Sequence, residues 1–250
     1  MNNNWDDFVN LYDWEFNLIN KEQKDDIDMW MSLCREYGSK ILEIGAGTGR
    51  ITTHLLSCEL KVTAVDNAPA FIDKLIVSNS SALLKTVVCD MRELDIDDKF
   101  SFCFFGYTTF QYLLTYEDQK KCLESLKPLL MNDGRVGFDL DPSICELPEL
   151  DREILLYKEY YSPDECMISM FTKHNVDHIN QITHWTDRYY YHKQIPKELV
   201  HSLSLKGVTL ESMRKLFDEV GFEIESVFGG FKFTEYNESS DRLIIIAKIR

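Results

Sequence analysis

The stretch ILEIGAGTGR, residues 41–50, decides the fold class of this chain. An apolar run that reads as a buried strand leads into glycines at every second position, and a helical segment follows. Glycine takes positive φ at little cost and lets a ligand approach the backbone, while the first turn of a helix offers unpaired N–H groups. The pattern predicts a nucleoside-cofactor loop. An ordinary strand-to-helix turn is the alternative, because short motifs also occur by chance.

The spacing of the glycines separates two kinds of cofactor loop. A dinucleotide fingerprint, G-x-G-x-x-G, would place glycine at position 50, where this chain has Arg50. Glu43 stands two residues before the first glycine, so the pattern is acid-x-G-x-G-x-G. A nicotinamide-dependent oxidoreductase is therefore the disfavoured reading.

Two further acids follow strand-like runs. Residues 62–65 form an apolar strand that ends in Asp66, 17 residues after Gly49, near the spacing at which an acid meets ribose hydroxyls. Residues 86–89 lead into Asp90 and Met91, 24 residues after Asp66, where a carboxylate and a thioether suit an adenine ring. A single acid is more often a helix cap. Three strand-end acids at regular spacing favour a bound ligand.

With these motifs the sequence resembles the class I S-adenosylmethionine-dependent methyltransferases, from about residue 41 to residue 141. The resemblance implies that S-adenosylmethionine is the cofactor, with the glycines beside its methionine portion, Asp66 on the ribose, and Asp90 with Met91 at the adenine. The full set of implied cofactor residues is Glu43, Gly45, Ala46, Gly47, Gly49, Asp66, Asn67, Asp90, Met91 and Tyr107.

The implied fold is α/β, a doubly wound, seven-stranded and mostly parallel sheet of Rossmann-like type. A chain of 250 residues with 44% apolar composition suits one domain with a full-sized core. We expect four parts within it: a helical cap at 1–38, the cofactor-binding core at 39–142, an antiparallel β insertion at 143–206 and the completion of the sheet at 207–250.

The N-terminal cap supplies one candidate catalytic residue. Trp5, Phe8 and Tyr12 recur at helical spacing, and a second apolar stripe ends near Gly38. Similar enzymes that act on small molecules commonly carry such a cap, and in several a Tyr-Asp pair like Tyr12-Asp13 turns its tyrosine toward the active site. A packing role for Tyr12 is the equal alternative.

The fourth strand leads to the expected mouth of the site. Residues 100–105 are apolar apart from Ser101, as in a central parallel strand covered on both faces. Residues 106–113 follow, and ligands in open α/β sheets lie beyond the carboxyl ends of the strands. Gln111 and Tyr112 are the other two candidate catalytic residues. Asp141, at the end of the fifth strand, either touches substrate or caps the next segment.

The insertion is rich in aromatic residues. Two strand-like runs, 167–174 and 181–192, surround an expected turn at 175–178 and predict an antiparallel hairpin. Enzymes of the resembling family that modify amino sugars carry a similar excursion, which forms a wall of the acceptor pocket or a subunit contact. A homodimer is therefore one expectation.

Composition narrows the partners. The chain has 27 basic and 42 acidic residues, a formal charge of −15, which disfavours nucleic acid as substrate. No run approaches the roughly 20 apolar residues of a membrane span. Seven scattered cysteines and the absence of a leader-like start favour a cytoplasmic protein. His174 and His178 lack a third ligand nearby, so no metal site is expected.

The predicted activity is methyl transfer to a small molecule, with amino-sugar and glycine-type N-methyltransferases as the nearest resemblance. An amine nitrogen is the preferred acceptor, because residues 106–116 contain no histidine to act as a base for a hydroxyl. The resembling amino-sugar enzymes often have histidine where this chain has Tyr112. O-methylation stays open, since His184, His192 or His201 could supply a base, as does a non-catalytic cofactor-binding subunit.

Overall fold

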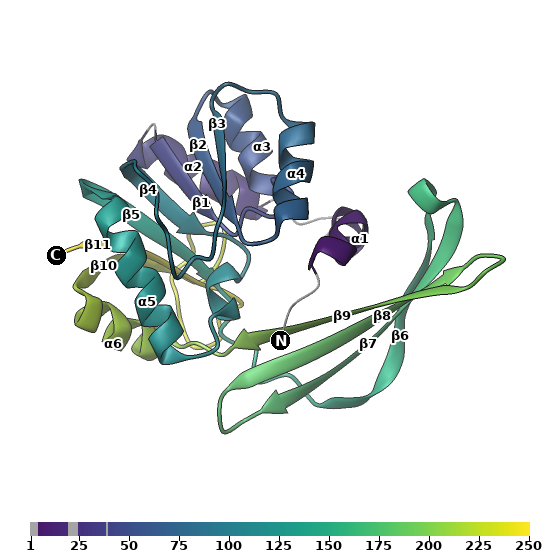
Figure 1. Ribbon diagram of the computed structural model, residues 1–250. Coiled ribbons are helices and arrows are strands. Elements are labelled where there is room, and N and C mark those ends of the chain that lie inside the picture. The colour runs from purple at the N-terminus through teal and green to yellow at the C-terminus, as the bar shows by residue number, and fades with distance from the viewer. Residues whose placement is uncertain (1–4, 20–24, 39) are drawn as a thin grey trace. The chain divides into compact units, whose positions relative to one another are not determined.

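The computed structural model describes residues 5–19, 25–38 and 40–250. The described part of the chain falls into two compact units (Figure 1). We call them the core unit, from residues within 22–142 and 208–250, and the insertion unit, from residues within 1–21 and 143–207.

A seven-stranded sheet forms the centre of the core unit, in the order β10-β11-β5-β4-β1-β2-β3. Five neighbouring strands, β3 to β5 in that order, pair in parallel, and β11 is antiparallel to both β5 and β10. The predicted seven-stranded, mostly parallel sheet is thereby confirmed. The strands are β1 Lys40–Ile44, β2 Lys61–Asp66, β3 Leu84–Val88, β4 Phe100–Phe105, β5 Leu130–Leu140, β10 Phe222–Phe228 and β11 Leu243–Ile249.

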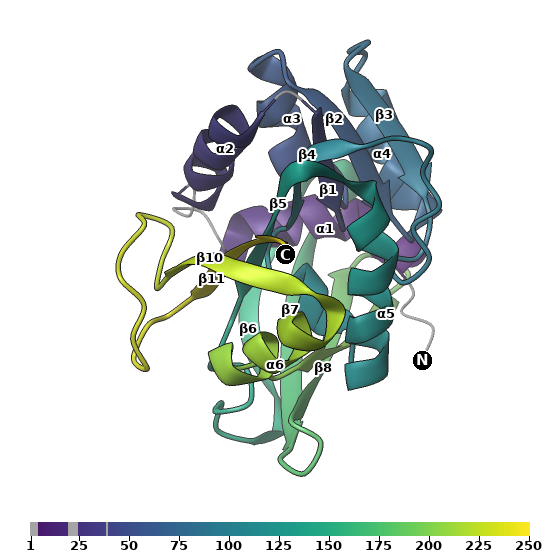
Figure 2. The same ribbon diagram turned by 90° about the vertical axis from the view of Figure 1, so that its left-hand side faces the viewer.

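Helices cover both faces of this sheet (Figure 2). They are α2 Asp25–Tyr37, α3 Arg50–Ser57, α4 Pro69–Ser78, α5 Tyr116–Leu126 and α6 Leu210–Val220. Successive residues of a strand point to opposite faces, so Ile41 packs with α2 and α3 while Leu42 packs with α5 and α6. The strand order reverses between β1 and β4, which is where a doubly wound sheet binds its ligand.

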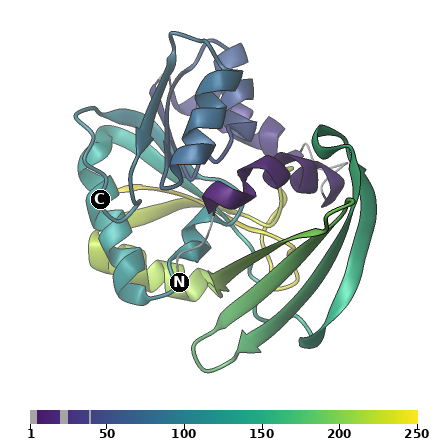
Figure 3. The ribbon, with the colours of Figure 1, turned by 45° about the vertical axis from the view of Figure 1, so that its right-hand side comes forward.

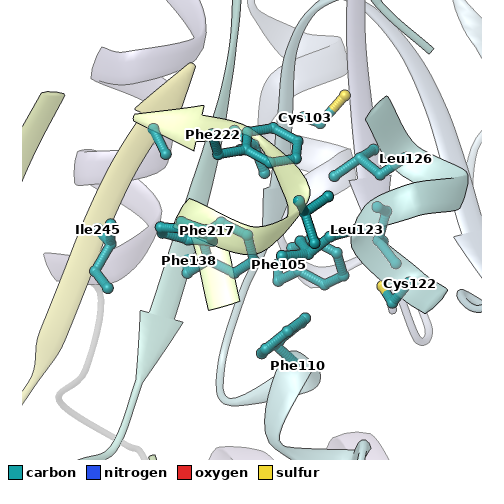
Figure 4. Packing of buried hydrophobic residues seen from close by; sticks show 14 of the residues in the cluster. Cys103, Phe105, Phe110, Cys122, Leu123, Leu126, Phe138, Phe217, Phe222 and Ile245 are labelled. Carbon is teal, nitrogen blue, oxygen red and sulfur yellow. The ribbon is translucent and has the colours of Figure 1, made fainter. Parts of the chain in front are cut away.

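Aromatic packing anchors the turn that follows β4. Phe105 and Phe138 stack with ring centroids 5.0 Å apart, and Phe110 meets both rings edge-on (Figure 4). Phe110 belongs to the short 3₁₀ helix η1, Thr109–Tyr112. Burying each phenylalanine side chain contributes roughly 1.5–3 kcal/mol. Packing of the Phe110 ring in the core therefore fixes the position of η1, which carries Gln111 and Tyr112.

The insertion unit is a four-stranded antiparallel sheet with helix α1, Trp5–Ile19, packed against it (Figure 3). The strand order is β6-β7-β8-β9. Phe8 and Leu11 of α1 share a buried cluster with Met170 and Tyr189 of the sheet. The strands are β6 Leu150–Tyr161, β7 Cys166–Asp177, β8 Ile182–His192 and β9 Lys197–Lys206.

The insertion differs from the predicted hairpin in two respects. Two further strands, β6 and β9, flank the predicted pair. The sequence of β6 does not indicate a strand, because most of its residues are exposed and its polar and apolar side chains do not alternate. The turn lies at 178–181 instead of 175–178. There the Asp177 carboxylate accepts the backbone N–H groups of Ile179 and Asn180, both at 3.0 Å, and closes the turn after itself.

The two N-terminal helices belong to different units, α1 to the insertion unit and α2 to the core unit. The residues Asn-Asp-Gly at 132–134 predict a turn before the fifth strand, but they lie inside β5, at an irregularity in its pairing with β4. The division into cap, core, insertion and completion stays a prediction. Within the described ranges, none of the helices is long and apolar enough to cross a membrane.

Candidate active site

The glycine loop joins β1 to α3 at the carboxyl edge of the sheet. Gly45, Gly47 and Gly49 have φ values of 71°, 56° and 91°, the left-handed region that favours glycine. The backbone N–H groups of Gly45 and Ala46 both donate to the Val65 carbonyl of β2, at 2.8 and 2.9 Å. The loop is therefore tied to the neighbouring strand by its own backbone.

Two of the glycines are required by packing inside the protein. A Cβ atom at Gly45 would lie 2.3 Å from the Thr109 methyl, and one at Gly49 would lie 2.2 Å from a Leu75 methyl. Neither distance is possible without displacement of a neighbour. These glycines let η1 and α4 approach the loop closely, which shapes the site as much as access for a ligand does.

Asp66 stands at the end of β2 and braces the same loop. Its Oδ2 accepts the Gly47 N–H at 2.8 Å, and its Oδ1 accepts the Ala68 N–H at 2.9 Å. Burial raises the pKa of Asp66, while the backbone N–H groups of Ala68, Gly47 and Asn67 oppose that rise. A carboxylate oxygen has two lone pairs. The Asp66 carboxylate therefore retains acceptor capacity for a further donor such as a ribose hydroxyl.

Glu43 is buried beneath the loop, on the face of β1 covered by α3. The Thr52 hydroxyl of α3 donates to it, and only 3% of the residue is exposed. Burial raises the pKa of Glu43 to about 7, against opposing contributions from Thr52 and Arg50. This first acid of the motif is therefore a buried support of the loop, and a direct contact with the cofactor stays a prediction.

We expect Glu43→Gln to stabilise the cofactor-free protein at pH 8 and to leave it nearly unchanged at pH 5. The folded pKa of about 7 exceeds the ordinary 4.5. The stability that depends on the protonated carboxyl is thus complete below pH 4.5 and is lost as pH rises through 7. The whole loss is at most roughly 3 kcal/mol.

Denaturant unfolding of both proteins at the two pH values measures this difference. The exposed Glu36→Gln of α2 is the matched control and should show no such dependence on pH. A stability difference between the Glu43 variant and the parent that is equal at pH 5 and pH 8 would contradict the assignment.

The turn after β4 holds Tyr107 in an unusual conformation. Tyr107 and Thr108 have φ values of 46° and 62°, which residues other than glycine rarely adopt. The Tyr107 N–H donates to Asp139 Oδ2 at 3.0 Å, and the Thr108 N–H donates to the Asp139 carbonyl at 3.0 Å. Asp139 therefore fixes the turn, and Tyr107 is left 38% exposed at the edge of the sheet.

Gln111 and Tyr112 lie in η1, directly after this turn. Gln111 is fully buried, its Nε2 donating to the Asp141 carbonyl at 3.0 Å and its Oε1 accepting the Asp141 N–H at 2.7 Å. It thus clamps η1 to the end of β5. Tyr112 is half-buried. A contact between either residue and the acceptor stays a prediction.

Tyr12 belongs to a different unit from these two candidates. It lies on α1 and is half-buried, with its ring near those of Trp5, Phe8 and Phe16. Its aromatic neighbours fit the packing alternative, and its catalytic role stays a prediction.

The predicted adenine residues follow β3, next to β2 in the sheet. Asp90 Oδ1 accepts the backbone N–H and Nε of Arg92, at 2.8 and 2.9 Å, and Oδ2 accepts the far guanidinium nitrogen at 2.6 Å. These bonds hold the pKa of Asp90 below its ordinary value. Oδ2 keeps one lone pair for an adenine amine. Met91 packs against the edge of the large apolar cluster.

Two ion pairs near the site were not predicted. Arg242, just before β11, donates through Nε to Asp139 Oδ1 at 2.8 Å. Arg50, the first residue of α3, donates to Asp26 of α2 at 3.1 Å, and its guanidinium carbon lies 5.9 Å from the centre of the Tyr107 ring. The buried acid Asp26 had no sequence motif to mark it. The sequence does indicate that Asp139 needs a partner, because this acid lies in an apolar strand and would be buried there.

The groups at the carboxyl edges of β4, β1, β2 and β3 fit S-adenosylmethionine. The glycine loop is pre-formed, the Asp66 carboxylate retains acceptor capacity, and Tyr107 presents a partly exposed side chain. Asp66 would hold the ribose, Asp90 with Met91 would hold the adenine, and the glycine loop would hold the methionine portion. An aromatic face beside a sulfonium is also favourable.

Comparisons with known proteins agree with this arrangement. Residues 41–134 match a family model described as a methyltransferase domain. A glycine/sarcosine N-methyltransferase from Aphanothece halophytica is 23% identical, over 98% of this chain and 86% of its own.

Two solved structures share the fold. A S-adenosylmethionine-dependent methyltransferase from Clostridium acetobutylicum has a TM-score of 0.80 at 15% identity, covering 98% of each chain. A sugar N-methyltransferase from Streptoalloteichus sp has a TM-score of 0.77 at 12% identity, covering 96% of this chain and 92% of that one. With the acid-x-G-x-G-x-G loop at the switch point of the sheet, the chain is a class I S-adenosylmethionine-dependent methyltransferase, and S-adenosylmethionine is its cofactor.

Proposed function

We propose that this enzyme methylates an amine nitrogen of a small molecule. The relative from Aphanothece halophytica and the solved sugar enzyme are both named as N-methyltransferases, which supports the proposal. The formal charge of −15 disfavours a polyanionic acceptor such as nucleic acid. A homodimer stays a prediction alongside it.

The observation that carries the proposal is the histidine content of the core unit. A hydroxyl acceptor must lose its proton as the methyl arrives, and a histidine near neutral pKa is the usual base. The sequence of the core unit contains one histidine, His54. It lies on an exposed position of α3 with Nδ1 2.9 Å from the Arg50 carbonyl. The core-unit residues that directly follow β4 and β5, 106–115 and 141–142, therefore contain no histidine.

The three histidines named as possible bases all lie in the sheet of the insertion unit. His184 Nδ1 lies 2.7 Å from the Ser204 hydroxyl, and His192 Nε2 lies 2.8 Å from the Ser169 hydroxyl. His201 is buried, and burial lowers its pKa to about 4. A base of that pKa is weak at neutral pH.

The chain's residues would act by positioning. When bound, S-adenosylmethionine supplies an electrophilic methyl group on a sulfonium sulfur. Gln111 fixes η1 against β5, and Tyr112 can orient an amine lone pair through its phenol, which is a poor base at an ordinary pKa of about 10. A neutral amine needs to shed its proton only to solvent. Alignment and exclusion of water then dominate the rate.

Product analysis tests the proposal. The enzyme is incubated with S-adenosylmethionine and paired acceptors that differ only in amine or hydroxyl, glycine against glycolate and glucosamine against glucose. Mass spectrometry with fragmentation locates the methyl group. We expect methyl on nitrogen in the amine of a pair and none on its hydroxyl partner.

Variants of the possible bases complete the test. His184→Ala and His192→Ala should retain the parent rate within about threefold, because neither imidazole would move a proton. Tyr112→Phe should lower the rate by about tenfold, the effect of one lost hydrogen bond. Methyl found on oxygen alone, or a rate that collapses in either histidine variant, would overturn the nitrogen assignment.

A further inference from the structure

A group of polar side chains lies on one face of the insertion sheet, under α1; three of them are buried and two are half-buried. We call it the acid–aromatic cluster; its members are Glu15, Tyr157, Asp187, Tyr189 and His201. Asp187 lies directly opposite His201 on β9, and residues directly opposite one another share a face of the sheet. Tyr189 and Tyr157 both lie opposite Met170, on β8 and β6. The Tyr189 hydroxyl donates to Glu15 of α1.

The cluster contains polar atoms that its own residues do not satisfy. Four buried side-chain atoms lack a hydrogen-bond partner among the described residues, and three of them are Tyr157 Oη, Asp187 Oδ1 and His201 Nε2. Asp187 and His201 are 7% and 3% exposed. A buried polar atom without a partner costs free energy. Three of them in one cluster indicate that a polar ligand belongs there.

The charges of the cluster select the kind of ligand. The two carboxyls, Glu15 and Asp187, interact unfavourably, and burial raises their pKa values to about 8 and 6. A side-chain hydrogen bond with Thr172 and the more distant His174 partly offset the rise at Asp187. His201 is neutral, since burial lowers its pKa to about 4. A cation would relieve this arrangement, and an anion would be repelled.

Aromatic rings form the walls of the same cluster. His201 stacks on Phe8 with centroids 4.3 Å apart, and the Trp5 ring lies 4.5 Å from His201. Phe8 lies 5.4 Å from Tyr189. Carboxylates combined with aromatic faces are the surroundings that protein sites offer to organic ammonium ions.

We propose that the acid–aromatic cluster binds a small organic ammonium ion, at a site separate from the amine that accepts the methyl group. An ammonium carries N–H donors for the three unpartnered atoms, Asp187 Oδ1, Tyr157 Oη and the neutral imidazole Nε2 of His201. A hydroxyl has one proton to donate and no charge. The inference goes beyond the proposed function, because every member of the cluster belongs to the insertion unit.

The test is binding of small probes to the full chain, followed by NMR at the ring resonances of His201 and Trp5. Ethanolamine is compared with ethylene glycol, and glucosamine with glucose, at millimolar concentration. We expect each amine to shift these resonances in a saturable way and each hydroxyl partner to leave them in place. Equal shifts from both members of a pair, or no shift from the amines, would mean that water or nothing fills the cluster and would overturn the proposal.

Variants locate the effect. Asp187→Asn should weaken amine binding about tenfold or more, the effect of one charge-assisted bond. The exposed Asp151→Asn of β6 is the matched control and should bind like the parent. Should Asp187→Asn fail to fold, Tyr157→Phe removes only the unpartnered hydroxyl and should also weaken binding. Unchanged affinity in a folded variant of Asp187 or Tyr157 would overturn the site.

The two proposals fail separately. Amine binding that depends on Asp187, without any N-methylated product, would leave the site standing and remove the proposed function. N-methylated product formed by a chain whose amine binding does not change in Asp187→Asn would leave the function standing and remove the site.

Discussion

Replacing Asp66 with alanine is expected to weaken binding of S-adenosylmethionine by about 100-fold or more. In addition to its bonds to the Gly47 and Ala68 N–H groups, Asp66 is expected to accept both ribose hydroxyls. Two ribose hydroxyls would thus lose a charged acceptor. A hydrogen bond to a charged group contributes about 1.5–3 kcal/mol, so two amount to at least about 3 kcal/mol.

Calorimetry with the parent, Asp66→Ala and Asp66→Asn measures this loss. The asparagine variant keeps one acceptor oxygen but turns an amide toward a backbone N–H, so its affinity should lie between the other two. Asp73→Ala, an exposed acid of α4, is the matched control and should bind like the parent. A parent-like affinity in Asp66→Ala would show that Asp66 does not hold the ribose.

The second large effect is expected on stability, when Arg242 is replaced with methionine. Asp139 is fully buried, the Arg242 side chain is 14% exposed, and the pair is joined by hydrogen bonds. Burial raises the pKa of Asp139 and Arg242 opposes the rise. Arg242→Met leaves a buried carboxylate without its cation, which costs about 3–5 kcal/mol.

Two comparisons make that prediction specific. Arg250→Met breaks an exposed pair with Asp218, which should cost at most about 1 kcal/mol. The double variant Asp139→Asn with Arg242→Met should recover most of the loss, because asparagine is neutral and its Oδ1 can still accept the Tyr107 N–H. Denaturant unfolding gives the four stabilities. Equal losses for Arg242→Met and Arg250→Met would contradict the buried pair.

Replacing Arg242 should also weaken cofactor binding, because its partner Asp139 holds the turn at Tyr107. Asp139 holds the Tyr107 turn through its side chain and the Thr108 N–H through its carbonyl. Two residues at positive φ persist only where their surroundings hold them there. Weaker cofactor binding in a folded Arg242 variant is therefore the companion readout to its lower stability.

The sequence alone determined the cofactor-binding half of the sheet. The glycine loop, the strand that ends at Asp66 and the β-α-β order rest on interactions between near neighbours, which leave a period and a spacing in the chain. The N-terminal residues of α4 and α5 follow the same rule: Pro69 opens α4, and Thr115 accepts the Asp118 N–H at the start of α5. The class I fold followed from these local signals.

Only the tertiary structure decided which distant side chains share a buried environment. Arg242 meets Asp139 across 103 residues, and Tyr189 meets Glu15 across 174. Such pairs depend on strand register and on which face a residue occupies, and a shift of one residue would reverse that face. Pairing of β6 and β9 with the predicted hairpin brings Tyr157 close enough to interact with Asp187 and places His201 directly opposite Asp187. In the sequence, Asp187 appears as an isolated acid within an aromatic strand. Its partners come from neighbouring strands, so packing determines them and no spacing in the sequence reveals them.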